Sequence, residues 1–314
     1  MLHFPKTKHE WLALRHKHIN SSEVAALFGV HPYMTAFELA VAKRSAEPND
    51  SEPSERMEWG LRLQREIARA IADEHGVKIR ALTAYAVDGH GHCRMGASFD
   101  FEVVGCEDGA DSELAKFARQ GAGVLEIKNV DAIVFRSYWL AGDALEPPAH
   151  IELQLQHQLA CIARRWGAIG VLVGGNRLEV ICRTRDNDVV SIIRQKCERF
   201  WDDLSRGVMP PVELPADAAA IAALYRYTEP NKVIHASAEI ERLIDEYARA
   251  TEVAKKAAED RDSAKARLLL AIGDAERVIG ARHTVTSTMI PDTEVPAHTR
   301  KGYRRITVTR KEKT

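Results

Sequence analysis

The sequence has no long apolar segment, and this absence argues against a membrane-spanning or exported protein. No apolar run in its 314 residues approaches the roughly 18 residues that a membrane-spanning helix needs. The N-terminal segment MLHFPKTKHEWLALRHKHIN lacks the apolar core of a secretory signal. We therefore expect no membrane-spanning helix and no export, which favours a cytoplasmic location.

Cysteines are also few, and their spacing excludes several kinds of site. The five cysteines are odd in number and scattered, without a C-x-x-C pair. This pattern argues against a disulfide framework and against a cysteine-bound zinc or iron–sulfur site. A short HGHC segment at 90–93 offers an alternative metal cluster, but it lies in a glycine-rich region where a turn is expected.

The chain has no surplus of charge of one sign. It carries 44 Lys+Arg against 45 Asp+Glu, for a formal net charge of −1. A basic signature over the whole chain is therefore absent, although binding to nucleic acid depends on where the charges lie. Hydrophobic residues make up 45% and charged residues 28%, which is typical of a globular protein with one large domain or two modest ones.

The pattern of the first two thirds of the chain predicts an α/β (α+β) core. Residues 10–45 and 55–75 have helical spacing, and three segments rich in Val and Ile follow: VKIRALTAYAV, MGASFDFEVV and GVLEIKNV. The polar, glycine-rich stretch between the last two is expected to be an elaborated turn. A helix over 150–166, a strand pair and a helix ending before Pro210 and Pro211 complete the predicted domain, which we place at 1–212.

The remainder, 213–314, is expected to form a helical arm and a small β hairpin. Residues 237–272 place apolar side chains in an approximate a/d pattern with charged residues between them. The alanine-rich seam predicts a long charged helix, either a coiled-coil arm or an antiparallel partner. The segments RHTVTSTMI and YRRITVTR are expected to form the two strands of the hairpin.

The strongest chemical pattern lies at the end of one predicted strand and within the next. If GVLEIKNV is a strand, Glu126 and Lys128 point to one face and Ile127 to the other, because strand side chains alternate. Asp100 ends the preceding SFD segment. Two neighbouring carboxylates repel unless a cation lies between them, and Mg²⁺ binds through one or two carboxylates. The alternative to a metal site is that the three residues are two surface acids and a lysine without a chemical role.

Six segments, in order across residues 10–212, resemble the YqaJ or lambda-exonuclease-like branch of the PD-(D/E)xK nuclease superfamily. They are WLALRHKHINSSEVAALFGV, MEWGLRLQREIA, MGASFDFEVV, GVLEIKNV, PAHIELQLQHQLACIARRWGAIGVLV and ERFWDDLSRGVMPP. They resemble the family patterns R-x-x-x-I-x-x-S-(D/E), W-G-x-x-x-E-x-x-A, S-P-D, G-L-L-E-I-K, Y-x-x-Q-x-Q and F-W…P-P. Six ordered matches are far more specific than any one of them.

The resemblance implies a restriction-endonuclease-like core, with a central mixed sheet flanked by helices. It implies a Mg²⁺-dependent DNA nuclease, with Mn²⁺ as a substitute, that digests duplex ends from 5′ to 3′ during phage or prophage recombination in a bacterial cell. A single-strand annealing protein is the implied partner, and a homo-oligomer, a trimer in the family, is the implied assembly.

The resemblance also implies a role for individual residues at the metal. Asp100 and Glu126 would hold the ion, helped by the main-chain carbonyl of Ile127, and Lys128 would position the attacking water. The family helix has Glu four residues after the glycine of its Trp-Gly pair, whereas this chain has Gln64. Gln64 is assigned to the metal as the aligned residue. Glu66 is a substitute only if the helix is shifted, because two helix residues differ by about 200° around the axis.

Four further residues are assigned to catalysis or DNA by the same resemblance. Arg15 and Ser22 would grip a phosphate near the DNA end, and Gln154 would orient groups in the active site. Gln156, on the same predicted helix, is assigned to DNA binding. Phe99 stands where the family usually has proline.

These departures, above all Gln64, leave two competing hypotheses open. The first is a catalytically weak or inactive DNA-binding module on the same fold. The second makes the C-terminal arm the main functional part, as an adaptor for assembly or for an annealing partner.

Overall fold

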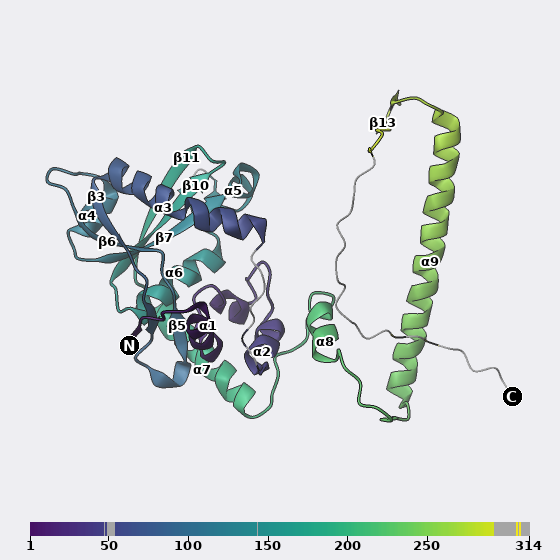
Figure 1. Cartoon of the computed structure of the whole chain (residues 1–314), viewed down its shortest axis with the longest axis horizontal. Helices are drawn as coiled ribbons and strands as arrows, with labels where there is room; N and C mark the ends of the chain where they lie inside the picture. Colours follow the sequence, from purple (N-terminus) through teal and green to yellow (C-terminus); the bar gives the residue numbers. More distant parts are fainter. Residues whose placement is uncertain (47, 49–53, 143, 292–305, 307, 309–314) are drawn as a thin grey trace. The chain divides into compact units, whose positions relative to one another are not determined.

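The protein is described by a computed structural model that covers residues 1–46, 48, 54–142, 144–291, 306 and 308 (Figure 1). The chain divides into two compact units, residues 1–221 and 222–314, which are described separately. No helix among the described residues is both long enough and apolar enough to cross a membrane.

A mixed five-stranded sheet forms the centre of the first unit (Figure 1). Its strand order is β11 (Arg177–Thr184), β10 (Trp166–Val173), β7 (Gly123–Val130), β6 (Phe101–Cys106) and β3 (Val77–Ala81). Strands β7 and β10 run parallel, and the other neighbouring pairs are antiparallel. The predicted fold class, a mixed sheet flanked by helices, is confirmed.

Helices cover both faces of this sheet. Helix α3 (Glu55–His75) and α4 (Glu113–Ala118) pack on one face, against Leu125 and Ile127 of β7. Helix α5 (Ala132–Tyr138) and α6 (Ala149–Cys161) pack on the other face, which receives Val124. Because side chains alternate along β7, the even-numbered Glu126 and Lys128 belong to the α6 face.

The boundaries of α3 follow from capping and from the spacing of its apolar residues. Ser54 accepts a hydrogen bond from the backbone N–H of Met57 at 3.4 Å, which begins the helix. Gly76 ends it with φ +62°, a left-handed conformation that glycine adopts without strain. Ile67, Ala68 and Ile71 form its buried face. The helix predicted over 55–75 is confirmed.

A second, smaller sheet lies beside the first and divides two of the predicted strands. Its order is β1 (Leu2–His3), β4 (Tyr85–Val87), β5 (Met95–Ala97) and β2 (Ile19–Asn20). The segment predicted as VKIRALTAYAV is β3 in one sheet and β4 in the other, and MGASFDFEVV is likewise β5 and β6. The two segments that pass from one sheet to the other lie side by side, since the N–H of Leu82 donates to the carbonyl of Asp100 at 3.3 Å.

The N-terminal region is less helical than its composition predicts. Helix α1 (Lys8–Lys17), the 3₁₀ helix η1 (Val24–Phe28) and α2 (Ala36–Arg44) are separated by β2 and a loop. The Asn20 amide explains the break, because it donates to the carbonyl of Arg15 at 2.9 Å and so bonds the backbone outside a helix.

Short helices occupy two regions where the sequence predicted none. Ser112 caps α4 through the N–H of Ala115, in the stretch expected to be a turn. Asp131 caps α5 through the N–H of Ile133 at 2.7 Å. The two-stranded ribbon of β8 (Leu140–Ala141) and β9 (Ala144–Leu145) follows. The last element of this core is α7 (Asn187–Ser205), which packs on the smaller sheet near η2 (Gly91–Cys93) and confirms the predicted closing helix.

The first unit continues beyond the predicted boundary at 212. Asp217 is fully buried and accepts hydrogen bonds from the Thr35 hydroxyl and from the N–H of Glu213. These bonds attach the chain after Pro211 to the start of α2. Helix α8 (Ala218–Leu224) spans the division between the units.

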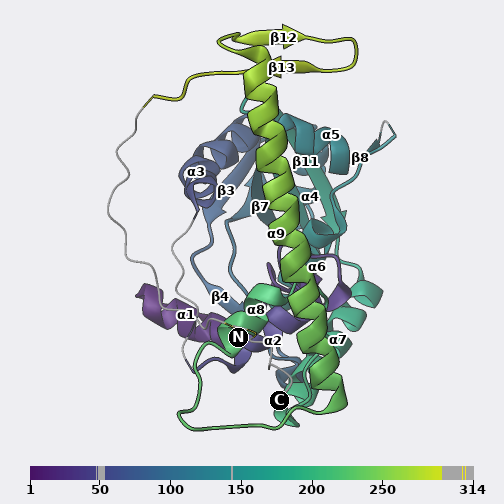
Figure 2. The same cartoon turned by 90° about the vertical axis from the view of Figure 1, so that its right-hand side faces the viewer.

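The second unit contains one long helix and a hairpin. Helix α9 (Ala238–Ile272) is unbroken, and Figure 2 shows the hairpin at its C-terminal end. Its strands are β12 (Arg277–Ile279) and β13 (Thr284–Thr286). The long helix is confirmed. The hairpin pairing is corrected, because RHTVT pairs with the preceding RVI; apart from positions 306 and 308, the segment YRRITVTR lies outside the described residues.

Candidate active site

Asp100 lies where the chain crosses between the two sheets, next to β7. The register of the antiparallel pair places Phe101 opposite Leu125. Asp100 Oδ2 accepts a hydrogen bond from the N–H of Ile127 at 2.8 Å. Two segments separated in the sequence are thereby joined at the end of β6.

Glu126 and Lys128 share the α6 face of β7, as the alternation predicted. Lys128 Nζ lies 2.6 Å from Glu126 Oε1. Glu126 is buried, whereas the Lys128 side chain keeps part of its surface in solvent. Ile127 points into the opposite core with α3. The structure therefore brings Asp100, Glu126 and Lys128 to one place.

Glu126 perturbs the titration of its neighbour Asp100. Burial and the nearby charge of Glu126 raise the pKa of Asp100 to about 7. The N–H of Ile127, the charge of Lys128 and a hydrogen bond from the Gln64 side chain act in the opposite direction. A buried aspartate whose pKa is raised by a neighbouring carboxylate is a candidate ligand for a cation.

Gln64 reaches the site from α3, and Glu66 does not. The Gln64 side chain lies close enough to Asp100 to lower its pKa. The Glu66 side chain is 64% exposed and pairs with Arg69 at 2.9 Å on the outer surface of the helix. The structure therefore selects Gln64, as the alignment of the motif indicated, and rules out the shifted helix.

Helix α6 contributes two glutamines, of which the sequence analysis found one. Gln154 Nε2 donates to Glu126 Oε1 at 2.6 Å, and Gln154 Oε1 accepts from Lys128 Nζ at 3.1 Å. Gln158 Nε2 donates to the other carboxylate oxygen, Glu126 Oε2, at 2.7 Å, and to the Ser98 carbonyl at 3.1 Å. The signal for Gln158 was its place four residues after Gln154, on the same helix face.

Gln156 is buried and bonds the backbone, so its predicted contact with DNA is wrong. It is only 3% exposed, and it lies two residues from Gln154, on another side of the helix. Its amide donates to the carbonyl of Thr184 at 3.1 Å and accepts from the N–H of Asp186 at 2.8 Å. Gln156 thus connects α6 to the loop that begins α7.

Arg15 and Ser22 are brought together, as the resemblance implied. Arg15 Nη2 lies 3.4 Å from Ser22 Oγ and 3.8 Å from Glu23 Oε1, and its guanidinium stacks over Trp11. Burial acts to raise the pKa of Glu23, but the charges of Lys43 and Arg15 outweigh it and lower that pKa. The ionised Glu23 holds the Arg15 guanidinium in place.

The donor set at Asp100 fits a hard divalent cation. Two carboxylates, a backbone carbonyl and an amide oxygen are the oxygen ligands that Mg²⁺ prefers. In the part of the chain that the structure describes, no three His, Cys, Asp or Glu residues gather as a metal cluster. The HGHC alternative is therefore not supported: Cys93 is buried, and its thiol donates to the carbonyl of His90.

The comparisons with known proteins point to one family. Residues 10–165 match the model of the YqaJ-like viral recombinase domain. The uncharacterized protein YqaJ of Bacillus subtilis (strain 168) is 25% identical over 245 residues, which cover 77% of this chain and 70% of that protein.

Two solved structures are more distant. An alkaline exonuclease from Laribacter hongkongensis has 18% identity and a TM-score of 0.45, over 68% of this chain and 97% of that one. A structure described as SSO0001 has 14% identity and a TM-score of 0.30, over 58% of this chain and 73% of that one. The family model and the curated relative agree with the ordered motifs of the sequence: residues 10–165 match the YqaJ-like viral recombinase family.

Proposed function

We propose that the protein is a Mg²⁺-dependent deoxyribonuclease that hydrolyses phosphodiester bonds from the 5′ ends of duplex DNA. The observation that carries the proposal is the convergence of Asp100, Glu126 and Lys128 beside the N–H of Ile127. The match to a viral recombinase family supports DNA as the substrate and recombination as the context.

Four groups of the chain would hold the ion. They are the carboxylates of Asp100 and Glu126, the carbonyl of Ile127 and the side-chain oxygen of Gln64. Bound there, Mg²⁺ would offset negative charge on the phosphate oxygens. Mn²⁺ takes the same kind of ligand and should substitute.

Lys128 positions the attacking water in this proposal. Its ammonium is held between Glu126 Oε1 and Gln154 Oε1, so its direction is set by two acceptors. Gln154 and Gln158 hold the Glu126 carboxylate through both of its oxygens. They are positioning residues, because they fix the geometry of groups that touch substrate.

Arg15 and Ser22 support the 5′-to-3′ polarity. A guanidinium binds phosphate through a planar fork of donors, and the neighbouring hydroxyl adds another. The Arg15 side chain is 24% exposed and is already oriented by Glu23. We assign the pair to the 5′-phosphate at the end of the duplex.

Digestion of linear duplex DNA tests the proposal directly. The protein with Mg²⁺ or Mn²⁺ should digest the DNA, and Lys128→Ala should lower the rate at least about 100-fold. Lys78→Ala, which changes an exposed lysine of β3, is the matched control and should retain the rate. Labels on the 5′ or the 3′ end report the polarity, since a 5′ label should be released first.

An inactive DNA-binding module is the second candidate, and Gln64 is the observation that favours it. A neutral amide replaces a carboxylate at the metal, which lowers the negative charge of the site. Binding of duplex DNA by the parent and by Lys128→Ala, without digestion by either, would select the module.

The proposal extends to the setting of the enzyme. A phage or prophage recombination nuclease acts in the bacterial cytoplasm, and it exposes single strands for an annealing protein. A homo-oligomer, such as a trimer, would keep the enzyme on one DNA end. Mass photometry of the full chain with and without duplex DNA measures the assembly.

A further inference from the structure

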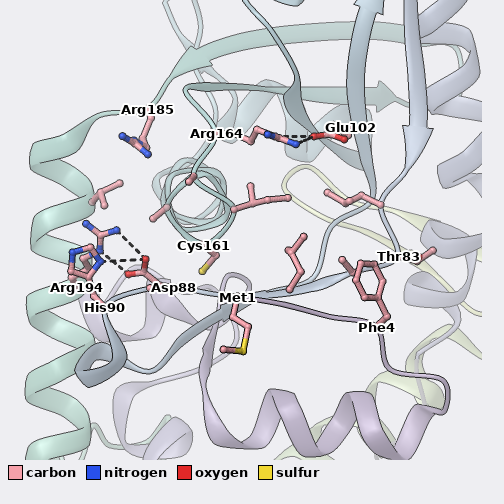
Figure 3. A pocket seen from close by; sticks show the side chains of 18 of the residues that line it. Met1, Phe4, Thr83, Asp88, His90, Glu102, Cys161, Arg164, Arg185 and Arg194 are labelled. Atoms are coloured by element: carbon pink, nitrogen blue, oxygen red, sulfur yellow. Dashed lines mark hydrogen bonds and ion pairs between the residues drawn. The ribbon is translucent and has the colours of Figure 1, made fainter.

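A large cavity in the first unit lies apart from the active site. Its volume is about 860 Å³, within the range of small-molecule sites. Its wall includes the C-terminal end of α6 and the residues after it, up to Arg164 (Figure 3). None of the side chains described at the active site, including Gln154 and Gln158, lines it. The cavity therefore has no part in the catalytic arrangement.

Two buried carboxylates hold three arginines in the cavity wall. Glu102 is fully buried and accepts from Arg80 Nη2 at 2.6 Å and from Arg164 Nε at 2.8 Å. Asp88 accepts two bonds from Arg194, at 2.7 and 3.0 Å (Figure 3). Such pairs fix the guanidinium planes and leave some of their five N–H donors for another acceptor.

A fourth arginine gives the cavity a surplus of positive charge. Arg185 donates to the side-chain oxygen of Asn187 at 3.1 Å, and it has no carboxylate partner among the described residues. Four arginines and two carboxylates line the cavity, so its side chains carry a surplus of two positive charges before His90 and the amino group of Met1 are counted. His90 Nδ1 lies 3.5 Å from Asp88 Oδ1 and adds charge only when protonated.

The rest of the wall is apolar. It includes Met1, Phe4, Leu82 and Ile162. Figure 3 shows Phe4 beside the crossing segment at Thr83, on the other side of the cavity from Arg185 and Arg194. A ligand that satisfies both sides needs a compact anion and a body with an apolar surface.

We propose that this cavity binds a 5′-phosphorylated nucleoside, either as a free mononucleotide or at the end of a strand. A phosphate monoester carries about 1.5 to 2 negative charges at neutral pH, which matches the surplus, whereas a carboxylate or a phosphodiester carries one. The planar base fits the apolar wall, and arginine forks suit phosphate oxygens. The proposal does not depend on nuclease activity.

Calorimetric titration with thymidine 5′-monophosphate in EDTA tests the site, because metal-dependent binding at Asp100 is then absent. The parent and Arg15→Ala, which removes the other phosphate site proposed above, should each keep one equivalent bound at the cavity. Thymidine or inorganic phosphate alone should bind there at least about 10-fold more weakly, since each lacks one half of the ligand. A 5′-phosphorylated oligothymidylate distinguishes the sources: tighter binding than the monomer assigns the site to a strand end, and equal or weaker binding assigns it to the free nucleotide.

Two variants and one control locate the binding. Arg185→Ala should weaken it at least about 10-fold, and Thr83→Trp, at an exposed lining position, should block the cavity. Arg177→Ala, which removes an exposed arginine of β11, should have no effect. Absence of binding in EDTA, equal binding of thymidine, or an unchanged affinity in both variants would overturn the proposal.

A second inference comes independently from α9. One side of the helix carries large apolar residues at both ends and alanines between them: Ile240, Leu243, Ile244, Tyr247, Ala254, Ala257, Ala258, Leu268, Leu269 and Ile272. No residue of α9 is buried within the described structure. The charges are unevenly placed, because 238–254 contains five acids and two arginines, whereas 255–272 contains five basic residues and three acids.

We infer that α9 pairs with α9 of a second copy in antiparallel orientation. This arrangement brings the acidic half of one helix against the basic half of the other. It also places Leu243 and Ile244 near Leu268 and Leu269 of the second copy, and it lets the central alanines approach closely. A parallel pair would place the two acidic halves side by side, at a cost in repulsion.

Disruption of the apolar side tests the pairing. By light scattering the full chain should be a dimer, or a hexamer if its first units also form the trimer proposed above. Leu243→Asn with Leu268→Asn should halve its mass. Leu270→Asn is the matched control, because Leu270 is 85% exposed and lies off the apolar side. A monomeric parent at tens of micromolar, or an assembly that both variants leave unchanged, would overturn the inference.

Cross-linking tests the orientation. Mixed chains carrying Ile240→Cys or Ile272→Cys should form a disulfide-linked pair on oxidation, and Ile240→Cys alone should form none beyond the parent level. A cross-link of Ile240→Cys to itself would indicate a parallel pair and would refute the antiparallel arrangement.

Discussion

At the scale of single residues, Asp100 is the group of the proposed site whose pKa is most clearly shifted. It is buried beside Glu126, and its pKa rises to about 7, well above the ordinary 3.8 of an aspartate. Metal binding requires the ionised form. The metal-free protein therefore holds this carboxyl in a state that costs stability whenever it is ionised.

We predict that the affinity for Mg²⁺ falls as the pH falls below about 7. Each Mg²⁺ that binds must displace the proton from Asp100, so the affinity should drop by up to about 10-fold per pH unit. Calorimetry between pH 5.5 and 8.5, in steps of about half a unit, measures this slope. An affinity for Mg²⁺ that stays constant between about pH 6 and 7 would contradict this prediction.

Removal of the charge at Asp100 should stabilise the metal-free protein at high pH. Because the folded pKa is raised, the folded state binds a proton that the unfolded state has lost, and stability falls as the pH rises through the window from 3.8 to about 7. In EDTA above pH 7, Asp100→Asn should raise Tm by several degrees, since the asparagine oxygen can still accept from Ile127. Asp108→Asn, at an exposed position, should leave Tm unchanged.

A carboxylate at position 64 should strengthen metal binding. Gln64→Glu adds a third negative charge where the amide now contacts Asp100, so the affinity for Mg²⁺ should rise at least about 5-fold. The same change should lower Tm in EDTA, because the added charge repels Asp100. Gln195→Glu on exposed α7 serves as the control. Equal affinities in the two variants would show that position 64 lies outside the metal's reach.

At the scale of elements, α6 divides its polar residues between catalysis and structure. Gln154 and Gln158 lie on the face that meets Glu126, and Gln156 lies on another side and bonds the backbone before α7. The sequence alone showed three glutamines at spacings of two. Only the direction of the helix relative to β7 decides which of them reach the metal site.

We predict that the two kinds of glutamine respond differently to substitution. Gln156→Ala should cost about 1–3 kcal/mol of unfolding free energy, because a buried carbonyl and N–H lose their partner, while the rate per folded molecule stays unchanged. Gln158→Ala should instead lower the rate at least about 10-fold, since it releases one oxygen of Glu126. Urea unfolding and DNA digestion separate the two effects. If the rate of Gln156→Ala falls by more than its loss of folded protein explains, Gln156 does contact DNA.

At the scale of the whole molecule, the chain forms two compact units, and these units should be separable in function. The buried Asp217 attaches the chain after Pro211 to Thr35, so the first unit ends near 221 rather than 212.

A chain that ends at 221 should fold and digest DNA at the parent's rate per site. A chain that ends at 212 should be less stable, because it lacks the bonds of Asp217. Thermal unfolding and digestion assays compare the two with the full chain. If the chain that ends at 221 folds but does not digest DNA, then α9 or the hairpin contributes to catalysis. That outcome would contradict the adaptor hypothesis, which gives the C-terminal arm no catalytic part.

The sequence by itself determined the long elements and pointed to the residues that we propose for the metal. Helical spacing ended by a glycine predicted α3, and strand alternation placed Glu126 and Lys128 on one face. These properties depend on neighbours in the chain. The resemblance of ordered motifs supplied Arg15, Ser22 and Gln64.

The tertiary structure decided what depends on contacts between distant segments. It divided two predicted strands between two sheets, because residues near 82 and 100 cross together from one sheet to the other. It also turned Gln156 away from the metal site, brought in Gln158 and formed the arginine cavity from separate elements. Periodicity reports which face a side chain occupies, but only packing determines what that face meets.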